Sequence, residues 1–162
     1  MKKIILIRHA KSDWNNYLLP DYDRPLAERG LRDATQMAAS LKKRGIQIDL
    51  ICSSTAQRAK QTSLLTAGVL GYSESKIHWK KSLYHASASH LLHFIQSQSD
   101  QVQTLVLIGH NPGLTELIVR LGVNLDNLPT AGQFAFSVLS KEWKDLSAAT
   151  CKFEWWDSPK KH

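Results

Sequence analysis

The stretch KIILIRHA at residues 3–10 decides how the rest of the chain is interpreted. Its four consecutive apolar residues, Ile4 to Ile7, form a run that is too short for a helix and rich in β-branched side chains, which is typical of a buried central strand. A second run of the same kind, TLVLI at residues 104–108, is followed by Gly109 and His110. The sequence therefore predicts two buried strands with a histidine just beyond the end of each.

A helix is predicted between these strands, from about Leu26 to Arg44, after a polar loop at residues 10–25. Apolar residues recur there at spacings of three and four and predict one buried face, which comprises Leu31, Ala34, Ala38 and Leu41. Three cations at residues 42–44, followed by Gly45, are a normal stop signal for a helix. We therefore interpret these cations as a helix end rather than as a binding patch.

The remaining elements alternate between strand and helix. Strands are predicted at residues 48–52, 77–83 (an edge), 134–139 and 151–156, the last two as a hairpin-like pair around a turn near 142–147. One helix is predicted after the strand at residues 48–52, with N-cap candidates at Ser53, Ser54 and Thr55, and runs to about Leu70. Two further helices are predicted over residues 88–98 and 113–121. This order predicts one domain over residues 1–162, a three-layer α/β/α sandwich around a mostly parallel central sheet.

The charge is the least ordinary feature of the composition. The 162 residues include 21 Lys and Arg against 14 Asp and Glu, a net charge of +7 that favours an anionic partner. Residues 1–60 hold 12 basic and 6 acidic residues, so most of the excess lies in the first part of the chain. No run of Lys and Arg exceeds three residues and no nucleic-acid-binding motif is present, which disfavours nucleic acid as the partner.

The N-terminus and the cysteines predict a cytoplasmic protein with no membrane segment. Only four apolar residues precede Arg8, whereas the core of a signal peptide needs about 7–15 and a membrane helix about 20. Cys52 and Cys151 are too few and too far apart for a disulfide framework or a zinc site. Their use as small apolar residues indicates a reducing compartment.

Charged side chains converge at the predicted ligand-binding edge of the sheet. His9 and His110 follow the two buried strands, and Arg8 ends the first of them. Arg58 lies four residues after Ser54, in the first turn of the helix that begins where another strand stops. Because parallel sheets bind ligands beyond the carboxyl ends of their strands, we expect these four side chains to lie around one crevice.

Two histidines and two arginines in one crevice predict a pocket for a doubly charged oxyanion such as phosphate. Arginine forks match phosphate oxygens. The predicted helix start at Asn111–Leu114, with Pro112 in its first turn, offers backbone N–H groups to the same anion, and Asn111 is a candidate phosphate contact. Neighbouring cations keep an imidazole neutral, and spacing alone allows either histidine to attack while the other assists. Metal-site, Walker and dinucleotide motifs are absent, so no metal or cofactor is predicted.

Five motifs, in this order, resemble those of the histidine phosphatase superfamily, the phosphoglycerate mutase-like proteins, and within it the small SixA-type protein phosphohistidine phosphatases. They are Arg8-His9-Ala10, Asp23-Arg24-Pro25-Leu26 with Gly30, Ser53-Ser54-Thr55-Ala56-Gln57-Arg58-Ala59 with Gln61-Thr62, Gly109-His110-Asn111-Pro112, and Pro129-Thr130-Ala131-Gly132. The resemblance implies a phosphoglycerate mutase-like fold and a cofactor-free phosphatase in which His9 is the nucleophile and becomes phosphorylated. The implied phosphate pocket comprises Arg8, Arg58 and His110, with Arg24 as an additional phosphate or substrate contact.

Two departures from the family pattern bear on the substrate. Ala10 stands where the family usually has glycine, which is tolerated if the backbone there needs no positive φ. Relatives that cleave phosphate esters carry a carboxylate general acid after the third strand, and residues 80–85 (KKSLYH) offer none. An alkoxide leaves poorly without a proton donor, whereas the imidazole of phosphohistidine can be protonated before its bond breaks. We therefore expect a phosphohistidine substrate, with Asp13, Asp23 or His85 as candidate proton donors.

A small chain without a large insertion leaves the pocket open to a phosphohistidine on another protein, such as a component of a phosphorelay or of a phosphotransfer chain. Trp14 and Tyr17, in the loop after the first strand, are candidate substrate contacts, and this loop could fold over the entrance. Two alternatives remain: a low-specificity phosphomonoesterase and a non-catalytic phosphoprotein-binding module. The pair of histidines disfavours the binding module, since arginines alone bind phosphate.

Overall fold

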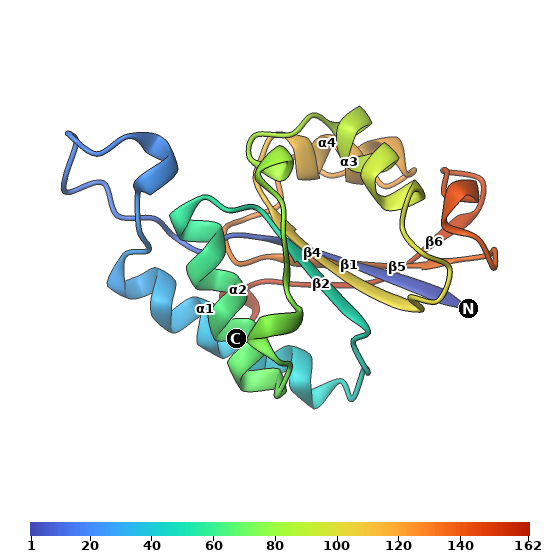
Figure 1. Ribbon diagram of the computed structural model, residues 1–162, viewed down its shortest axis with the longest axis horizontal. Coiled ribbons are helices and arrows are strands. Elements are labelled where there is room, and N and C mark those ends of the chain that lie inside the picture. The colour runs from blue at the N-terminus through green and yellow to red at the C-terminus, as the bar shows by residue number, and fades with distance from the viewer.

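The computed structural model describes all 162 residues and places a six-stranded sheet between two pairs of helices (Figure 1). The strands are β1 (Lys2–Arg8), β2 (Leu50–Ser53), β3 (His78–Trp79), β4 (Thr104–Gly109), β5 (Gln133–Val138) and β6 (Cys151–Asp157). The helices are α1 (Glu28–Lys43), α2 (Gln57–Leu70), α3 (Ala88–Gln96) and α4 (Gly113–Arg120). A one-turn 3-10 helix, η1 (Asp21–Asp23), interrupts the loop between β1 and α1.

The sheet is parallel on one side of β1 and antiparallel on the other. Its strand order is β3-β2-β4-β1-β5-β6, with β1, β4, β2 and β3 paired in parallel and β5 and β6 added antiparallel, so the prediction of a mostly parallel sheet is confirmed. Arg8 on β1 pairs with Gly109 on β4. The next residues, His9 and His110, therefore leave the sheet side by side at the same edge.

Both faces of the sheet are covered, which explains the continuous apolar run in β1. Ile4 and Leu6 belong to the core under α3 and α4, whereas Ile5 and Ile7 belong to the core under α1 and α2. Figure 1 shows these two helix pairs above and below the sheet, and the three-layer prediction is confirmed. Each fully buried aliphatic side chain stabilises this arrangement by about 1.5–3 kcal/mol. None of the helices is long and apolar enough to cross a membrane.

Two sequence predictions about the helix and edge strand need correction. Leu31 is 40% exposed, because the buried stripe of α1 passes through Gly30, Ala34, Met37, Ala38 and Leu41. Leu31 lies one position beside this stripe and faces solvent. The predicted edge strand at residues 77–83 is reduced to the two residues of β3, because the chain turns into a 3-10 helix at Lys81–Leu83.

The start of α2 also differs from the prediction. Ser53 belongs to β2, and α2 has Ala56 as its N-cap with no side-chain hydrogen bond. The Ser54 hydroxyl oxygen instead accepts the backbone N–H of Ala56 within the loop, at 3.2 Å. The three candidate residues therefore shape the connection between strand and helix rather than cap the helix, and this connection aims Arg58 at the strand ends.

Two glycines allow helices to approach the loops that carry the crevice. A Cβ on Gly30 would lie 2.1 Å from the Lys11 carbonyl oxygen, and one on Gly113 would lie 2.1 Å from the Ala86 carbonyl oxygen. Both distances are far below van der Waals contact. Only glycine thus lets α1 pack against the loop after β1 and lets α4 pack against the loop that precedes α3.

Candidate active site

The crevice lies at the carboxyl ends of β1, β4 and β2 and encloses a cavity of about 240 Å³. It is lined by Arg8, His9, Lys11, Ser12, Trp14, Asp21, Arg24, Arg58, His85, His110, Asn111 and Thr130. All four side chains expected around one crevice are among these residues, with Arg24 and Asn111. The lining is almost entirely polar and contains one carboxylate, which suits an anionic ligand.

The His9 ring is fixed in one tautomer. The backbone N–H of His9 donates to the Gly109 carbonyl oxygen at 3.1 Å, which ties the residue to the end of β4. Its Nδ1 lies 2.7 Å from the Ala10 carbonyl oxygen, a group that accepts hydrogen bonds only, so Nδ1 carries the proton. Nε2 is left with a lone pair, and it accepts a hydrogen bond from Arg58 Nε at 3.3 Å.

The loop after His9 is held from α2. The Ala10 backbone N–H donates to the Thr62 hydroxyl at 3.0 Å, and this hydroxyl donates in turn to the Arg58 carbonyl oxygen at 2.8 Å. Ala10 is buried, and its backbone does not adopt a positive φ. The expectation that alanine replaces the usual glycine without backbone strain is therefore confirmed.

Burial and positive neighbours keep both histidines neutral. Burial, with further contributions from Arg58 and Arg8, lowers the pKa of His9 to about 3. Burial, His9 and Arg58 lower the pKa of His110 to about 2. The two rings lie 5.1 Å apart between centroids. At neutral pH the floor of the cavity, formed by Arg8, His9, Arg58 and His110, therefore combines two uncharged imidazoles with two guanidinium groups.

His110 presents its other nitrogen to the cavity. Its Nε2 lies 2.8 Å from the Ser54 hydroxyl oxygen, and this oxygen already accepts the Ala56 N–H. The Ser54 proton is thus free to be donated to Nε2, and in the tautomer that accepts it the ring proton of His110 lies on Nδ1. Nδ1 is buried and has no partner in the protein. It is therefore a hydrogen-bond donor available to a bound anion.

Arg8 and Arg58 differ in how their guanidinium groups are held. Arg8 donates from Nη1 to the Leu128 carbonyl oxygen at 3.0 Å, while its buried Nε has no partner. Burial and Arg58 lower the pKa of Arg8. Arg58 donates from Nη1 to the Asp21 carbonyl oxygen at 2.6 Å and from Nη2 to the Asp21 carboxylate at 2.9 Å. Both guanidinium groups are thus fixed before any ligand binds, which is the condition for strong oxyanion binding.

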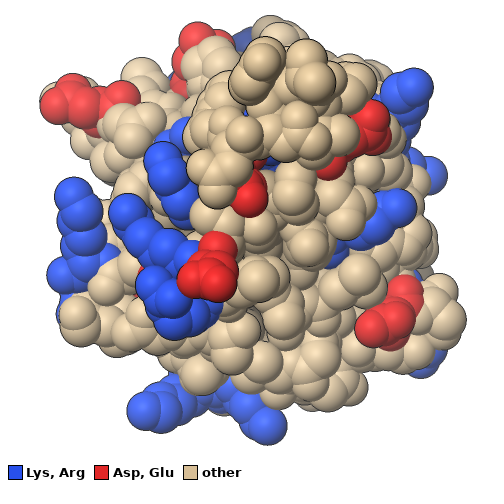
Figure 2. Space-filling view, turned by 90° about the vertical axis from the view of Figure 1, so that its left-hand side faces the viewer, with Lys and Arg blue, Asp and Glu red and all other residues tan.

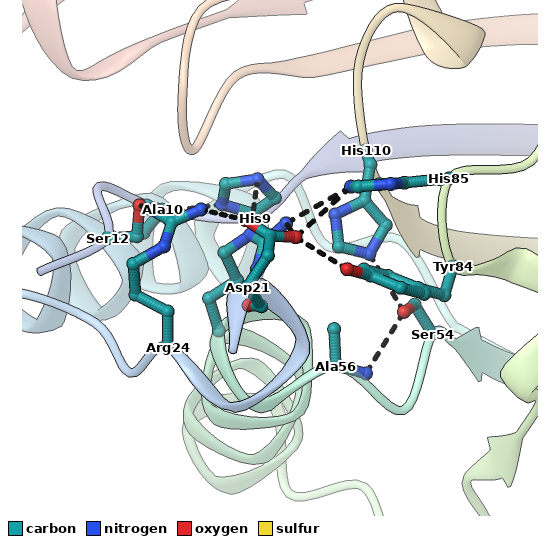
Figure 3. A network of polar contacts seen from close by, with 11 residues as sticks. His9, Ala10, Ser12, Asp21, Arg24, Ser54, Ala56, Tyr84, His85 and His110 are labelled. Carbon is teal, nitrogen blue, oxygen red and sulfur yellow. Dashed lines mark hydrogen bonds and ion pairs between the residues drawn. The ribbon is translucent and has the colours of Figure 1, made fainter. Parts of the chain in front are cut away.

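Asp21 is the functional residue that the sequence interpretation missed. Figure 3 shows its carboxylate between the two sides of the site, where it accepts hydrogen bonds from Arg24, Arg58 and Tyr84. Burial alone raises the pKa of this carboxyl, but the hydrogen bonds from Tyr84, Arg24 and Arg58 outweigh it and hold the pKa well below its usual range. The signal was present in the spacing Asp21-x-x-Arg24 after Pro20, because residues three apart lie on one side of a 3-10 turn.

Arg24 lies at the cavity, as expected, but its guanidinium is occupied from several sides. It donates to Ser12 and to Asp21, and it stacks 3.5 Å from the centre of the Trp14 ring. Trp14 lines the cavity with its own ring and also supports the Arg24 guanidinium that stacks on it. Tyr17, the other aromatic of this loop, points to solvent and is 87% exposed.

Part of the predicted helix N-terminus is already engaged within the protein. Asn111 donates its side-chain amide to the Leu128 carbonyl oxygen and to Asn127, and it accepts the Thr115 N–H at 3.1 Å. The Leu114 N–H donates to the His110 carbonyl oxygen at 3.1 Å. These internal partners give Asn111 a positioning role at the start of α4, where a phosphate contact was expected.

Of the three candidate proton donors, only His85 lines the cavity. Asp13 accepts the Asn15 N–H in the outer loop, and Asp23 is exposed on η1, so neither lines the cavity. His85 lines it, with Nε2 at 3.4 Å from the Asp21 carboxylate. No group of three or more His, Cys, Asp or Glu side chains is arranged to hold a metal ion.

The face that carries the cavity is bordered by positive charge. Figure 2 views the molecule from the side on which the 10–25 loop projects in Figure 1. Lys and Arg side chains lie along the edges of this face, with isolated Asp and Glu side chains between them. Such a distribution draws an anionic ligand toward the arginines at the strand ends.

Comparison with known proteins gives a consistent result. Residues 4–83 match the family model described as histidine phosphatase superfamily (branch 1). An uncharacterised chloroplastic protein of Arabidopsis thaliana is 31% identical over 162 residues, which cover 95% of this chain and 74% of the relative.

Solved structures agree over nearly the whole chain. One described as the phosphohistidine phosphatase SixA of Agrobacterium tumefaciens has a TM-score of 0.82 at 25% identity, covering 98% of this chain and 99% of its own. The protein histidine phosphatase SixA complexed with tungstate has a TM-score of 0.83 at 20% identity, covering 98% of each chain. The arrangement of helices and strands is therefore the one these proteins share.

Proposed function

Because the chain belongs to the histidine phosphatase superfamily, we propose that it is a metal-independent phosphohistidine phosphatase that cleaves the P–N bond of a phosphorylated histidine on another protein. Membership itself indicates phosphatase chemistry. The observation that carries the proposal is the state of His9, whose Nδ1 proton is engaged by the Ala10 carbonyl while its Nε2 lone pair lies beside Arg58. A neutral imidazole whose Nε2 lone pair is fixed at the cavity, with only a 3.3 Å hydrogen bond from Arg58, is a nucleophile ready for an electrophilic phosphorus.

In the first half of the reaction, His9 Nε2 attacks the phosphoryl group and becomes phosphorylated. Arg8, through its unpartnered Nε, and Arg58, through its remaining N–H groups, stabilise the negative charge that spreads over the equatorial oxygens. Burial lowers the pKa of His9 and the same cations lower it further, to about 3, so the side chains that bind phosphate also help to keep the nucleophile neutral. In the second half, water attacks phospho-His9 and releases inorganic phosphate.

The two histidines have different roles in this proposal. The Nδ1–H of His110 is a donor without a protein partner, whereas the Nε2 of His9 is an acceptor. A donor binds a phosphate oxygen and an acceptor attacks phosphorus. The tautomers therefore support His9 as the attacking group and His110 as a phosphate ligand, a choice that spacing alone leaves open.

The protonation state of the cavity carboxyl group supports a phosphohistidine rather than a phosphate ester as the substrate. Asp21 is the single carboxyl group of the lining, and its hydrogen bonds keep it ionised. An ionised carboxylate cannot protonate a departing alkoxide, and alkoxides leave poorly as anions. A phosphorylated imidazole can carry its proton before the P–N bond breaks, so it leaves as a neutral ring.

The surroundings of the cavity support a protein as the carrier of that histidine. The cavity is small, so most of a substrate lies outside it. The loop beside it exposes Trp14, Tyr17 and Leu18, and exposed neighbouring apolar groups of this kind are typical of protein contacts. The structural likeness to SixA proteins supports the same substrate class, with a phosphorelay or phosphotransfer component as the partner.

The state of the cysteines supports a cytoplasmic location for this activity. Cys52 and Cys151 are both free. Cys52 lies in the core, and burial raises the pKa of its thiol to about 12, so it is unreactive. Unpaired cysteines persist where thiols are kept reduced.

Two substrates and one variant test the proposal. The wild-type protein and His9→Ala are each given a phosphohistidine peptide and p-nitrophenyl phosphate, without added metal and with a chelator present. We expect faster turnover of the peptide than of the ester. His9→Ala should lose at least about 10⁴-fold of both activities, as expected for removal of a covalent nucleophile. His90→Ala, on the exposed face of α3, is the matched control and should retain activity.

The trapped intermediate identifies the nucleophile independently. A phosphohistidine formed on His9 is labile in acid and stable in alkali, as a phosphoramidate is. Unchanged activity in His9→Ala, or an acid-stable adduct, would contradict the mechanism. Equal or faster turnover of the ester would leave the mechanism intact and replace the substrate by a small phosphate ester.

A further inference from the structure

His85 occupies an unusual place at the mouth of the cavity. Its side chain is 54% exposed and lines the cavity beside the Asp21 carboxylate (Figure 3). Its Nε2 lies 3.4 Å from Asp21 Oδ2 and 3.4 Å from Arg58 Nη2, and its Nδ1 has no partner. His85 is therefore the one imidazole of the site that reaches both the buried phosphate-binding groups and solvent.

The backbone of His85 is in a conformation that side chains rarely adopt. Its φ is 52°, and Ala131 is the only other non-glycine residue with a positive φ. Strained residues of this kind cluster at functional sites. The ring is held by stacking on Tyr84, with centroids 4.1 Å apart, and by an edge-on contact with His110 at 5.5 Å. The chain thus accepts an unfavourable turn that directs this imidazole across the cavity mouth.

The remaining exposed histidines show no comparable arrangement. His78, His90, His93 and His162 lie outside the cavity lining, and none has a positive φ. The neighbouring Tyr84 hydroxyl is already donated to Asp21 at 2.6 Å, and burial raises its pKa, so it keeps its proton. Among the groups at the mouth, His85 alone combines a ring nitrogen without a protein partner with a place in the cavity lining.

We propose that His85 is a catalytic proton donor and acceptor of this reaction, placed on the leaving-group side and oriented by Asp21. The inference rests on the proposed function and deepens it. His85 first gives the proton of its imidazolium to the ring nitrogen of the substrate that is not bound to phosphorus. His9 Nε2 then forms the bond to phosphorus while the substrate P–N bond breaks, and the departing nitrogen keeps the electron pair, so the substrate imidazole leaves as a neutral ring. Neutral His85 then removes a proton from water as its oxygen attacks phospho-His9. The P–Nε2 bond breaks, inorganic phosphate leaves, and both histidines return to their starting states.

Such a donor suits the substrate. One ring nitrogen of an imidazole donates and the other accepts, so the same ring can give a proton to the leaving imidazole and later take one from water. Nε2 lies beside the Asp21 carboxylate and Arg58, which leaves Nδ1 as the ring nitrogen without a protein partner. This pairing makes the site selective for a nitrogen leaving group and also gives it a weak activity toward esters of moderately acidic alcohols.

The test compares leaving groups in the first turnover. Formation of the phosphoenzyme is followed by rapid quench for wild type, His85→Asn and the surface control His90→Asn. Asparagine tolerates the left-handed backbone but cannot transfer a proton. We expect His85→Asn to slow phosphoenzyme formation from a phosphohistidine peptide about 100-fold. The rate from p-nitrophenyl phosphate should change by less than about threefold, because p-nitrophenolate leaves without a proton.

Chemical rescue separates proton transfer from positioning. In His85→Gly, which keeps the backbone conformation, added imidazole should restore a large part of the rate with the peptide and leave the rate with p-nitrophenyl phosphate unchanged. An equal loss with both substrates, or no loss with either, would overturn the role of His85. If the wild-type protein leaves the peptide intact, the proposed function fails instead. In that case the rate of phosphoenzyme formation from phenyl phosphate is compared with the rate from p-nitrophenyl phosphate, and a loss in His85→Asn that is confined to phenyl phosphate still decides the role of His85.

Discussion

The floor and the rim of the cavity are built in different ways. The floor consists of Arg8, His9, Arg58 and His110, which are fixed at strand ends or in the first turn of a helix and are largely withdrawn from solvent. The rim consists of the 10–25 loop and residues 84–85, most of which are partly or fully exposed and are held by side-chain contacts. The floor holds what every phosphoryl transfer needs, and the rim holds what distinguishes one substrate from another.

This difference teaches where variation in activity is expected. A change in the floor alters the pocket for the phosphoryl group itself, so it should affect all substrates alike. A change in the rim alters contacts with the leaving group or with the protein that carries it, so its effect should depend on the substrate. Each of the following changes tests whether that division holds.

Arg58 tests the floor most severely. Arg58→Ala removes the donor beside His9 Nε2 and should lower kcat/KM about 10²- to 10³-fold for both the phosphohistidine peptide and p-nitrophenyl phosphate. Arg58→Lys should recover little, because an ammonium group cannot replace the three directed contacts of the guanidinium. Steady-state kinetics on both substrates checks this, and a loss confined to one substrate would contradict the division between floor and rim.

The pH dependence of stability gives the next test. An unfolded histidine titrates near pH 6.5, whereas His9 and His110 stay neutral in the fold down to about pH 3 and 2. Below pH 6.5 the unfolded state therefore binds more protons, and the free energy of unfolding falls as the pH is lowered. Between pH 7 and 5 we expect a loss of up to about 2 kcal/mol for each histidine.

Asp21 behaves differently over the same range. Folding lowers the pKa of the Asp21 carboxyl, so Asp21 contributes fully to stability at every pH above about 4, the pKa of an aspartate in the unfolded chain. This contribution is lost only as the pH falls below that value. Urea unfolding at pH 7, 6 and 5 measures the slope. His9→Gln should remove about half of it, and Asp21→Asn should leave it unchanged. A slope that persists in full in His9→Gln would show that other groups produce it.

The floor could be predicted from the sequence because sheet geometry determines it. Two apolar runs, each with a histidine just beyond its end, become parallel neighbours, and the register then brings His9 and His110 together whatever the loops do. Arg58 follows from the same rule, since α2 starts beyond the neighbouring strand. Asn111 is the exception in this set, because its amide is taken by the Leu128 carbonyl from a distant loop. A competing acceptor of that kind leaves no trace in local spacing.

Arg24, Trp14 and His85 were predicted as residues of the rim and line the cavity, but the way they are placed could not be predicted because it depends on how loops turn. The segment that contains Asp13 and Asp23 was recognised as a source of carboxylates, but it is Asp21 that η1 directs toward Arg58. His85 reaches the cavity through a left-handed turn that no residue pattern announces at a histidine. Sequence patterns carry the period of helices and strands, whereas loop conformations are decided by the long-range contacts that they themselves make.

Asp21→Asn examines the boundary between floor and rim. Loss of the charge weakens the contacts that hold Arg24 and Arg58, and because the carboxylate is partly exposed we expect a moderate fall in kcat/KM of about tenfold. The fall should be similar for both substrates, since Asp21 acts through the arginines, in contrast to the substrate-dependent effect of His85→Asn. Asp23→Asn, two residues away and exposed, is the matched control and should change kcat/KM by less than about twofold. A larger loss in Asp23→Asn would mean that η1 as a whole, rather than the Asp21 carboxylate, holds the site.

The outer part of the rim should show the smallest and most selective effect. Tyr17 and Leu18 are 87% and 79% exposed and make no contribution to the floor. If they contact a carrier protein, the double change Tyr17→Ser and Leu18→Ser should raise KM for a phosphorylated protein about 3- to 10-fold, because peripheral contacts contribute little each. KM for free phosphohistidine should stay the same, since that molecule does not reach beyond the cavity.

Leu139→Ser supplies the control for this comparison. Leu139 is 57% exposed and follows β5 at the edge of the sheet opposite the cavity, because Val138 pairs with Lys2 at the start of β1. Loss of an exposed leucine there should alter neither substrate. A rise in KM for free phosphohistidine in the double variant would place Tyr17 and Leu18 with the cavity itself. Equal KM values for the phosphorylated protein in wild type and double variant would instead confine recognition to the buried floor and to His85, with no protein-specific part in the 10–25 loop.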